Sequence, residues 1–211
     1  MTVIDCDQRT AAWHAVRLGK LTGTGAGDML TTIRKGEAAA RRDLRLRLVC
    51  ERLTGASAED SYISKEMQRG IDLEPAARAA YEAATGHLVR PVGFVAHDEL
   101  LAGCSPDGEV RGFTGIVEIK CPKSATHLSY LRTRTLPADY WPQVTHNLWI
   151  TGAQWCDFVS FDDRFPPELQ LFRIRLPREA VDLTAYELAA RLFLDEVAHE
   201  LADVQGLRAA A

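Results

Sequence analysis

Residues 104–122, CSPDGEVRGFTGIVEIKCP, contain two short runs of strand-forming residues on either side of turn signals. The turn formers are Ser105-Pro-Asp-Gly108, and the run from Thr114 to Lys120 is rich in Val and Ile. Ten residues separate Asp107 from Glu118. This pattern predicts neighbouring strands with acidic residues near one end of the pair.

Side chains alternate between the faces of a strand, so Glu118 and Lys120 are expected on one side and Ile119 in the core. If the strand ending near Asp107 pairs with the strand carrying Glu118, the two carboxylates converge. Converging carboxylates repel unless a cation lies between them, and Mg²⁺ prefers such oxygen ligands. Lys120 could then orient or deprotonate an attacking water. Alternatively, Asp107 only starts a turn, and Glu118 and Lys120 form a solvated ion pair on an edge strand.

The flanking sequence predicts an α/β fold with a mixed sheet, in one domain spanning residues 1–211. Helices are expected at 37–53, 64–85, 124–131, 142–150 and 178–204, with Gly55 and Gly86 as stop signals. Strands are expected at 87–97, 100–105, 114–120, 155–161 and 169–176, and the first three are predicted to form a meander.

The composition is that of a globular protein, with a formal net charge of -4. No apolar run is long enough for a membrane span, and a cytosolic protein is expected. The five scattered cysteines lack a CxxC pair, which favours free thiols over zinc or an iron–sulfur cluster. Residues 34–52 carry seven basic and three acidic residues, whereas residues 177–211 carry three and seven. One basic face could therefore hold a polyanion.

Pro106-Asp107 with Glu118-Ile119-Lys120 resembles the PD-(D/E)xK nuclease signature. More narrowly, the sequence resembles the phage lambda exonuclease-like family of viral recombinases and alkaline exonucleases. Four further blocks match in order: Trp13-His14 with Arg17–Thr24; Arg69–Glu74 with Ala77 and Tyr81-Glu82; Tyr140–Gln143 with Trp149–Thr151; and Trp155–Asp162. The resemblance implies a restriction-endonuclease-like core, with a mixed central sheet flanked by helices.

The resemblance also implies roles for the residues of the signature. Asp107, Glu118 and the Ile119 carbonyl would be metal ligands, and Lys120 would position the attacking water. Glu74 would complete a second metal position or hold a metal-bound water, although it could be an ordinary solvated helix acid. Gln143 would form a hydrogen bond near Lys120 or the nucleophile, or else make a core contact.

By the same resemblance, Arg17 and Thr24 would hold the 5′-terminal phosphate of the digested strand. The family more often has serine at the position of Thr24. Arg17 could alternatively pair with a nearby acid. Arg34 would lie in the DNA groove, and Met67 would insert between the terminal bases. Trp13 could stack on a base, although core packing is the default for tryptophan.

The implied activity is a Mg²⁺-dependent 5′-to-3′ exonuclease of double-stranded DNA, with two ions expected and Mn²⁺ able to substitute. It would release mononucleotides and leave a 3′ single-stranded tail for annealing. The rivals are a structure-specific or restriction-type endonuclease and a catalytically silent DNA-end-binding protein.

The expected partners are duplex DNA ends, a single-strand annealing protein and two further copies in a homotrimeric ring. The expected setting is the cytosol of a bacterial or phage-infected cell. In the ring, residues 34–52 are expected to line the channel, and the acidic C-terminal helix is expected to lie outside it.

Overall fold

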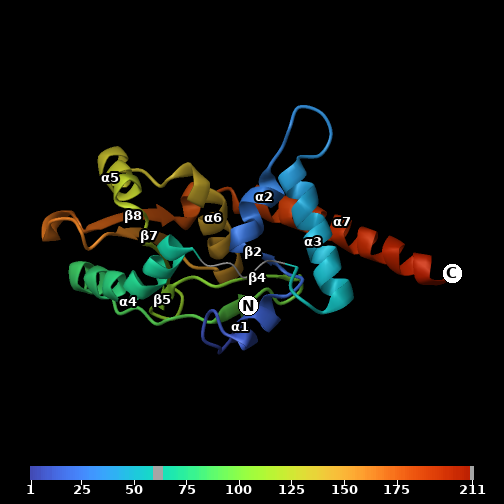
Figure 1. The fold of residues 1–211 in the computed structure, drawn as a ribbon, viewed down its shortest axis with the longest axis horizontal. Coiled ribbons are helices and arrows are strands. Elements are labelled where there is room, and N and C mark those ends of the chain that lie inside the picture. The colour runs from blue at the N-terminus through green and yellow to red at the C-terminus, as the bar shows by residue number, and fades with distance from the viewer. Residues whose placement is uncertain (59–63, 210–211) are drawn as a thin grey trace.

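The computed structural model describes residues 1–58 and 64–209, and its strands form two four-stranded sheets (Figure 1). The first sheet has the order β1 (Thr2–Ile4), β3 (Phe94–Ala96), β4 (Ala102–Cys104) and β2 (Leu21–Thr22). The second has the order β5 (Gly108–Val110), β6 (Gly115–Lys120), β7 (Trp155–Phe161) and β8 (Leu171–Pro177). Each sheet contains one parallel pair, β2 with β4 and β6 with β7. The predicted α/β fold with mixed strands is confirmed.

The predicted meander is wrong, because the strands before and after Asp107 belong to different sheets. β4 pairs with β3 and β2, whereas β5 begins at Gly108, directly after Asp107, and pairs with β6. Pro106 has no N–H to donate to a ladder, which favours an interruption at this point. Asp107 therefore lies where the chain passes from one sheet to the other.

The long helices agree with the predicted ones to within a few residues at most ends. They are α3 (Ala39–Thr54), α4 (Lys65–Thr85), α5 (Ser124–Thr133), α6 (Trp141–Thr151) and α7 (Leu183–Ala209). Gly55 and Gly86 end α3 and α4 in the left-handed conformation, as expected. α7 begins five residues later than predicted, because Arg178–Ala180 form a 3₁₀ turn.

Two short helices and three further 3₁₀ turns complete the described elements. They are α1 (Ala11–Arg17), α2 (Ala26–Leu30), η1 (Gly23–Gly25), η2 (Ala138–Tyr140) and η3 (Pro167–Leu169). Among the described helices, none has the length and apolar character needed to cross a bilayer.

Helices cover both faces of the second sheet. Val117 and Ile119 pack on the face that meets Tyr81 of α4. Ile116 and its neighbours pack on the opposite face, against Leu148 of α6. Because side chains alternate, Glu118 shares the face of Ile116 and therefore lies beneath α6.

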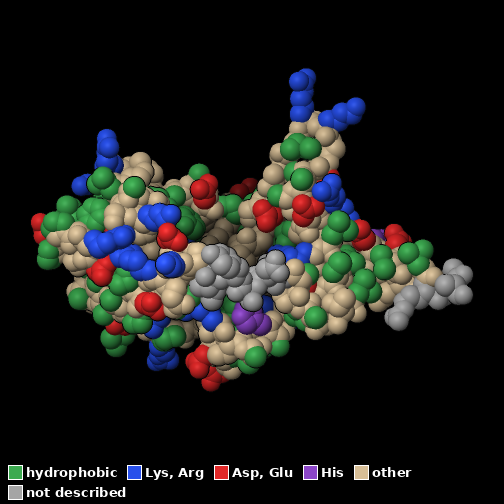
Figure 2. Space-filling model, in the orientation of Figure 1, with side chains coloured by type: hydrophobic (Ala, Val, Ile, Leu, Met, Phe, Trp, Pro, Cys, Tyr) green, Lys and Arg blue, Asp and Glu red, His purple; other side chains and the backbone are tan. Residues whose placement is uncertain are grey.

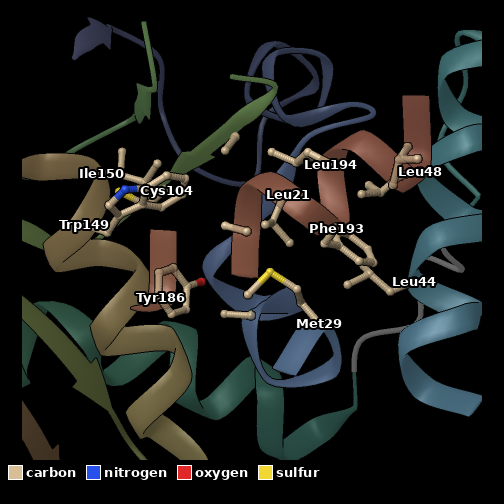
Figure 3. Close-up of a cluster of buried hydrophobic side chains, with 14 of the residues drawn as sticks. Leu21, Met29, Leu44, Leu48, Cys104, Trp149, Ile150, Tyr186, Phe193 and Leu194 are labelled. Carbon is tan, nitrogen blue, oxygen red and sulfur yellow. The ribbon is translucent and has the colours of Figure 1, made fainter. Parts of the chain in front are cut away.

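A separate apolar core joins the first sheet to α3, α6 and α7 (Figure 3). Leu21 of β2 and Leu44 and Leu48 of α3 meet Phe193 of α7 in this cluster. Full burial of side chains of this size contributes roughly 1.5–3 kcal/mol each. This packing fixes α3 against the segment that follows Arg17.

The basic segment and the acidic C-terminal helix lie side by side, because α3 packs along α7. The lining of a channel by residues 34–52 stays a prediction. Arg41 donates to both carboxylate oxygens of Glu196, at 2.7 and 3.0 Å, and Arg45 pairs with Glu200. Complementary charge between the two helices accounts for this pairing. These two arginines are therefore engaged within the chain and do not form an open channel lining.

Candidate active site

Glu118 is the centre of a buried carboxylate site on β6. The residue is only 1% exposed, and β6 lies between β5 and β7. One carboxylate oxygen accepts hydrogen bonds from Lys120 Nζ and Gln143 Nε2, both at 2.5 Å. The other accepts from Asn147 Nδ2 at 3.0 Å. The alternative of a solvated ion pair on an edge strand is therefore excluded.

The three donors compensate the cost of burying this negative charge. Gln143 and Asn147 are four residues apart on α6, so both side chains project from one helix face. Burial disfavours the charged form of Lys120, but the carboxylates of Glu118 and Asp107 outweigh it and raise the lysine pKa. Lys120 is thus held as a cation beside Glu118.

Asp107 lies beside Glu118, because the β5–β6 register places Gly108 opposite Val117. Its Oδ2 atom accepts a hydrogen bond from the Ile119 N–H at 2.6 Å. Burial, followed by repulsion from Glu118 and Glu74, raises the pKa of Asp107 to about 8, although Lys120 opposes this shift. Asp107 is thus a buried carboxyl group close to two other carboxylates, with Lys120 as a neighbouring cation.

Glu74 approaches the site from α4. Its two carboxylate oxygens accept hydrogen bonds from Arg9 at 2.6 Å and from Arg78 at 2.9 Å. The side chain is half-buried, and its charge contributes to the raised pKa of Asp107. Glu74 is thus not a freely solvated helix acid.

The carboxylate site fits a divalent cation by the chemistry of its donors. Asp107, Glu118 and the Ile119 carbonyl offer hard oxygen donors, and the pKa of Asp107 is raised first by burial and then by the carboxylates of Glu118 and Glu74. Among residues 1–58 and 64–209, no group of three or more His, Cys, Asp or Glu side chains is arranged to hold a metal. Mg²⁺ prefers oxygen donors of the kind that Asp107 and Glu118 offer, and it usually keeps several waters. All five cysteines are free of disulfide bonds.

A second polar region, here called the end pocket, is a cavity of about 40 Å³ between α1, β2 and α3. Its polar lining consists of His14, Arg17, Lys20, Thr22, Thr24, Arg47, Glu51 and Ser57. Burial, followed by repulsion from Arg47, lowers the pKa of Arg17 to about 10. The pocket thus gathers cationic side chains in a partly enclosed space, which is the environment that an anion requires.

Arg17 and Thr24 both line the end pocket. Among the described residues, Arg17 forms no ion pair with an acid; its guanidinium lies 3.9 Å from the ring centre of Trp13. The Trp13 Nε1–H donates to Ser105 Oγ at 2.8 Å, which fixes the indole. The hydroxyl oxygens of Thr24 and Thr22 are 3.0 Å apart.

Two predicted DNA-binding residues line neither the end pocket nor the carboxylate site. Arg34 is exposed on the loop between α2 and α3, which projects from the body and carries basic side chains at its tip (Figures 1 and 2). Met67 is 55% exposed in the first turn of α4. Their roles stay predictions.

Sequence reasoning missed several residues of both regions. Asn147 could have been found from its spacing, one helical turn after Gln143. Arg47 and Glu51 also lie one turn apart on α3, but only tertiary packing shows that they face Arg17. Arg78 could have been found from its spacing, since it lies four residues after Glu74 on the predicted helix, whereas Arg9 had no local signal that linked it to Glu74.

Comparisons with known proteins bear on the family and the fold. A family profile described as the YqaJ-like viral recombinase domain matches residues 12–154. The crystal structure of an alkaline exonuclease, LHK-Exo from Laribacter hongkongensis, is 39% identical, covers 95% of this chain and 99% of its own, and has a TM-score of 0.86. LHK-Exo in complex with dAMP gives the same values.

A phage-related exonuclease from Haemophilus somnus 129PT shares the fold. It is 15% identical, covers 86% of this chain and 96% of its own, and has a TM-score of 0.65. A search of curated proteins finds no match.

Proposed function

The chain belongs to the YqaJ-like viral recombinase family, the lambda exonuclease-like branch of the PD-(D/E)xK nucleases, and on this premise we propose that it is a DNA exonuclease acting on duplex ends. It degrades one strand in the 5′-to-3′ direction, releases mononucleotides and leaves a 3′ single-stranded tail. The observation that carries the proposal is the juxtaposition of Asp107, Glu118 and Lys120 with Gln143 and Asn147 around one buried carboxylate.

Asp107, Glu118 and the Ile119 carbonyl would hold Mg²⁺, with Mn²⁺ as a substitute, and Glu74 would contribute to a second ion. A bound divalent cation supplies Lewis-acid stabilisation of the phosphate and lowers the pKa of bound water. Lys120 positions the attacking water and offsets negative charge in the transition state, since it is held as a cation beside Glu118. Gln143 and Asn147 keep the Glu118 carboxylate in one orientation.

The end pocket supports the choice of a 5′ end. Arg17 and Thr24 would hold the terminal phosphate, because a guanidinium and a hydroxyl both donate hydrogen bonds to phosphate oxygens. The relative LHK-Exo has been crystallised with dAMP, a mononucleotide, which agrees with a mononucleotide product. We expect a 5′-phosphorylated duplex to be digested faster than a 5′-hydroxyl duplex.

Digestion of linear duplex labelled at the 5′ or the 3′ end, with and without Mg²⁺, tests this function. We expect early release of 5′-labelled mononucleotide, only with the ion present, and no attack on a covalently closed circular duplex. Cleavage of the closed circle would instead indicate the rival endonuclease. Duplex binding without cleavage under all metal conditions would indicate a silent end-binding protein.

Assembly into a homotrimeric ring is part of the proposal, because a few phosphate contacts give weak, salt-sensitive binding and long digestion runs need enclosure. Head-to-tail interfaces close such rings. Arg34 and Lys35, which stand exposed on the α2–α3 loop, are available to meet the duplex, whereas Arg41 and Arg45 are not. A monomeric mass by light scattering, together with long runs, would contradict the link between ring and processivity.

A single-strand annealing protein in a bacterial or phage-infected cell would receive the 3′ tail. This partner follows from the proposed product and from the family, and no surface is assigned to it.

A further inference from the structure

The carboxylate of Glu74 is held between two arginines that come from different parts of the chain. Arg78 lies one turn further along α4 and donates to Oε1 at 2.9 Å. Arg9 lies between β1 and α1 and donates to Oε2 at 2.6 Å. The Arg78 side chain is 20% exposed and belongs to the same helix as Glu74, whereas the Arg9 side chain is 43% exposed. Arg9 is therefore the partner that can leave the carboxylate more easily.

A tight turn presents Arg9 to Glu74. The N–H and the hydroxyl of Thr10 both donate to the Asp7 carbonyl, at 3.4 and 2.6 Å, and Arg9 is the third residue of this turn. Its φ is +68°, a conformation that favours glycine or asparagine at this position. An arginine there indicates that the surrounding contacts fix the turn.

Gln8 ties the same turn to the carboxylate site. Its Nε2 atom donates to the carbonyls of Val92 and Pro106, at 2.8 and 3.1 Å, and Pro106 is directly followed by Asp107. The turn lies before residues 12–154, to which the family profile is matched. A segment outside the matched part of the chain thus contacts the site both beside Asp107 and at Glu74.

The charges around Glu74 determine how well it can serve a cation. A divalent ion that Glu74 helps to hold would compete with Arg9 for Oε2 and would be repelled by the guanidinium, since like charges a few ångströms apart oppose each other. Arg78 bonds the other oxygen. Loss of the Arg9 contact alone would therefore free one oxygen while Glu74 stays tethered to its own helix.

We propose that Arg9 is a displaceable counter-ion of Glu74, which holds this carboxylate in the metal-free protein and thereby sets the affinity for the second divalent ion. This inference rests on the proposed function, in which Glu74 contributes to a second ion. Arg9 acts through Glu74 and is thus a positioning residue. Its removal strengthens ion binding, whereas loss of a purely structural contact would weaken it.

Mn²⁺ binding to the DNA-free protein tests this role without catalysis. Electron paramagnetic resonance measures the free ion, and a titration at constant pH and low ionic strength gives a Kd for each bound ion. Arg9→Asn removes the charge and suits the positive φ. It should tighten the weaker ion by about tenfold, the effect of one charge on a dication about 6 Å away in water. Arg9→Gly, which suits the turn equally, should give the same result.

Arg111→Asn is the matched control. Arg111 also has a positive φ, 52°, and is exposed in the turn between β5 and β6, at the end of this strand pair remote from Asp107. The substitution removes the same charge from the same kind of backbone. We expect wild-type Kd values for both ions, and thermal unfolding in EDTA should show that all these variants are folded.

A double-mutant cycle shows whether Arg9 acts through Glu74. Glu74→Gln should weaken binding of the weaker ion, and Arg9→Asn added to it should bring little further change. An equal gain with and without Glu74 would reduce the effect to general electrostatics and overturn the proposal. Unchanged or weaker ion binding by Arg9→Asn, or binding of fewer than two ions by the wild type and the variant alike, would also overturn it.

The same titrations separate this inference from the proposed function. A protein that digests linear duplex with Mg²⁺, but whose Arg9→Asn variant binds Mn²⁺ like the wild type, contradicts the inference alone. Tighter ion binding by Arg9→Asn in a protein that digests no DNA contradicts the proposed function and leaves the role of Arg9 standing.

Discussion

The carboxylate site and the end pocket differ in how their charged side chains are arranged. At the carboxylate site, Glu118 accepts hydrogen bonds from three neighbouring side chains, so its orientation is fixed within the protein. Among the described residues that line the end pocket, Arg17, Lys20 and Arg47 are cationic and Glu51 is anionic. The first region fixes a buried carboxylate by neighbouring donors, whereas the second gathers mostly cationic side chains in a partly enclosed space. Substitutions in the two regions should therefore change different properties.

Helix α6 packs both on the second sheet and on η1, which carries Thr24 of the end pocket. Gln143 and Asn147 reach Glu118 from one side of this helix. His146 lies between them in sequence, is fully buried, and contacts the Gly103 carbonyl at 2.9 Å and the Tyr186 hydroxyl at 2.8 Å. A change at His146 should affect the stability of both regions.

The largest effect is expected at the carboxylate site. Asp107→Asn should lower the cleavage rate by about a thousandfold or more, because it removes a charged ligand from the proposed metal site. Without metal, the variant should be at least as stable as the wild type, because burial and the charges of Glu118 and Glu74 already oppose ionisation of Asp107. Digestion assays and thermal unfolding in EDTA measure the two properties.

Asp72→Asn is a control for this substitution, because Asp72 is exposed on α4 and pairs only with Gln68 among the described contacts. Near-normal Mg²⁺-dependent digestion by Asp107→Asn would remove Asp107 from the site. A strongly destabilised variant would mean that this carboxylate has a structural role that the present contacts do not show.

The next largest expected effect is the pH dependence of stability that His146 causes. Burial is the main cause that lowers the pKa of His146 to about 4, from an ordinary value of 6.5. As the pH falls below 6.5, the unfolded chain takes up a proton before the folded one, so this group costs stability between pH 6.5 and 4. The loss should approach about 3 kcal/mol near pH 4.

Urea unfolding at several pH values measures this loss. His146→Gln cannot titrate, and its stability should depend less on pH over the same window, whatever its absolute value. Equal pH dependence in the two proteins would show that His146 is not the group responsible.

The smallest expected effect is the one that best distinguishes the role of the carboxylate site from that of the end pocket. Asn147→Ala removes one of the three donors to Glu118 and should lower kcat by about tenfold, the usual cost of a lost hydrogen bond to a charged group. The affinity for duplex ends and the preference for a 5′-phosphate should stay at wild-type values, because Asn147 does not line the end pocket. A changed end preference would show that the two regions are coupled through α6.

Local patterns predicted the parts of the fold that depend on neighbours in sequence. The placement of Glu118 and Lys120 on one side of β6 follows from strand alternation, and the end of α4 at Gly86 follows from helix capping. The same patterns predicted that Asp107 and Glu118 lie together, since these two residues are close in sequence. Their chemical roles still await experiment.

Contacts between distant segments could not be predicted in this way. From the sequence alone, the basic stretch on α3 is expected to be an open surface. In the structure, α3 packs against α7, and Glu196 lies beside Arg41. Similarly, nothing local shows that Gly115 must be glycine, although a Cβ there would lie 2.1 Å from the Trp155 ring. The division into two sheets depends on such long-range packing and not on the strand pattern.

The parallel pairing of β6 with β7 determines when a growing or refolding chain can first cut DNA. Parallel strands need a crossover, and residues 121–154 supply it with α5 and α6. Since Gln143 and Asn147 lie on that crossover, Glu118 acquires its full set of donors only after the crossover has docked. A partly folded chain in which the crossover has not docked should therefore lack the assembled carboxylate site.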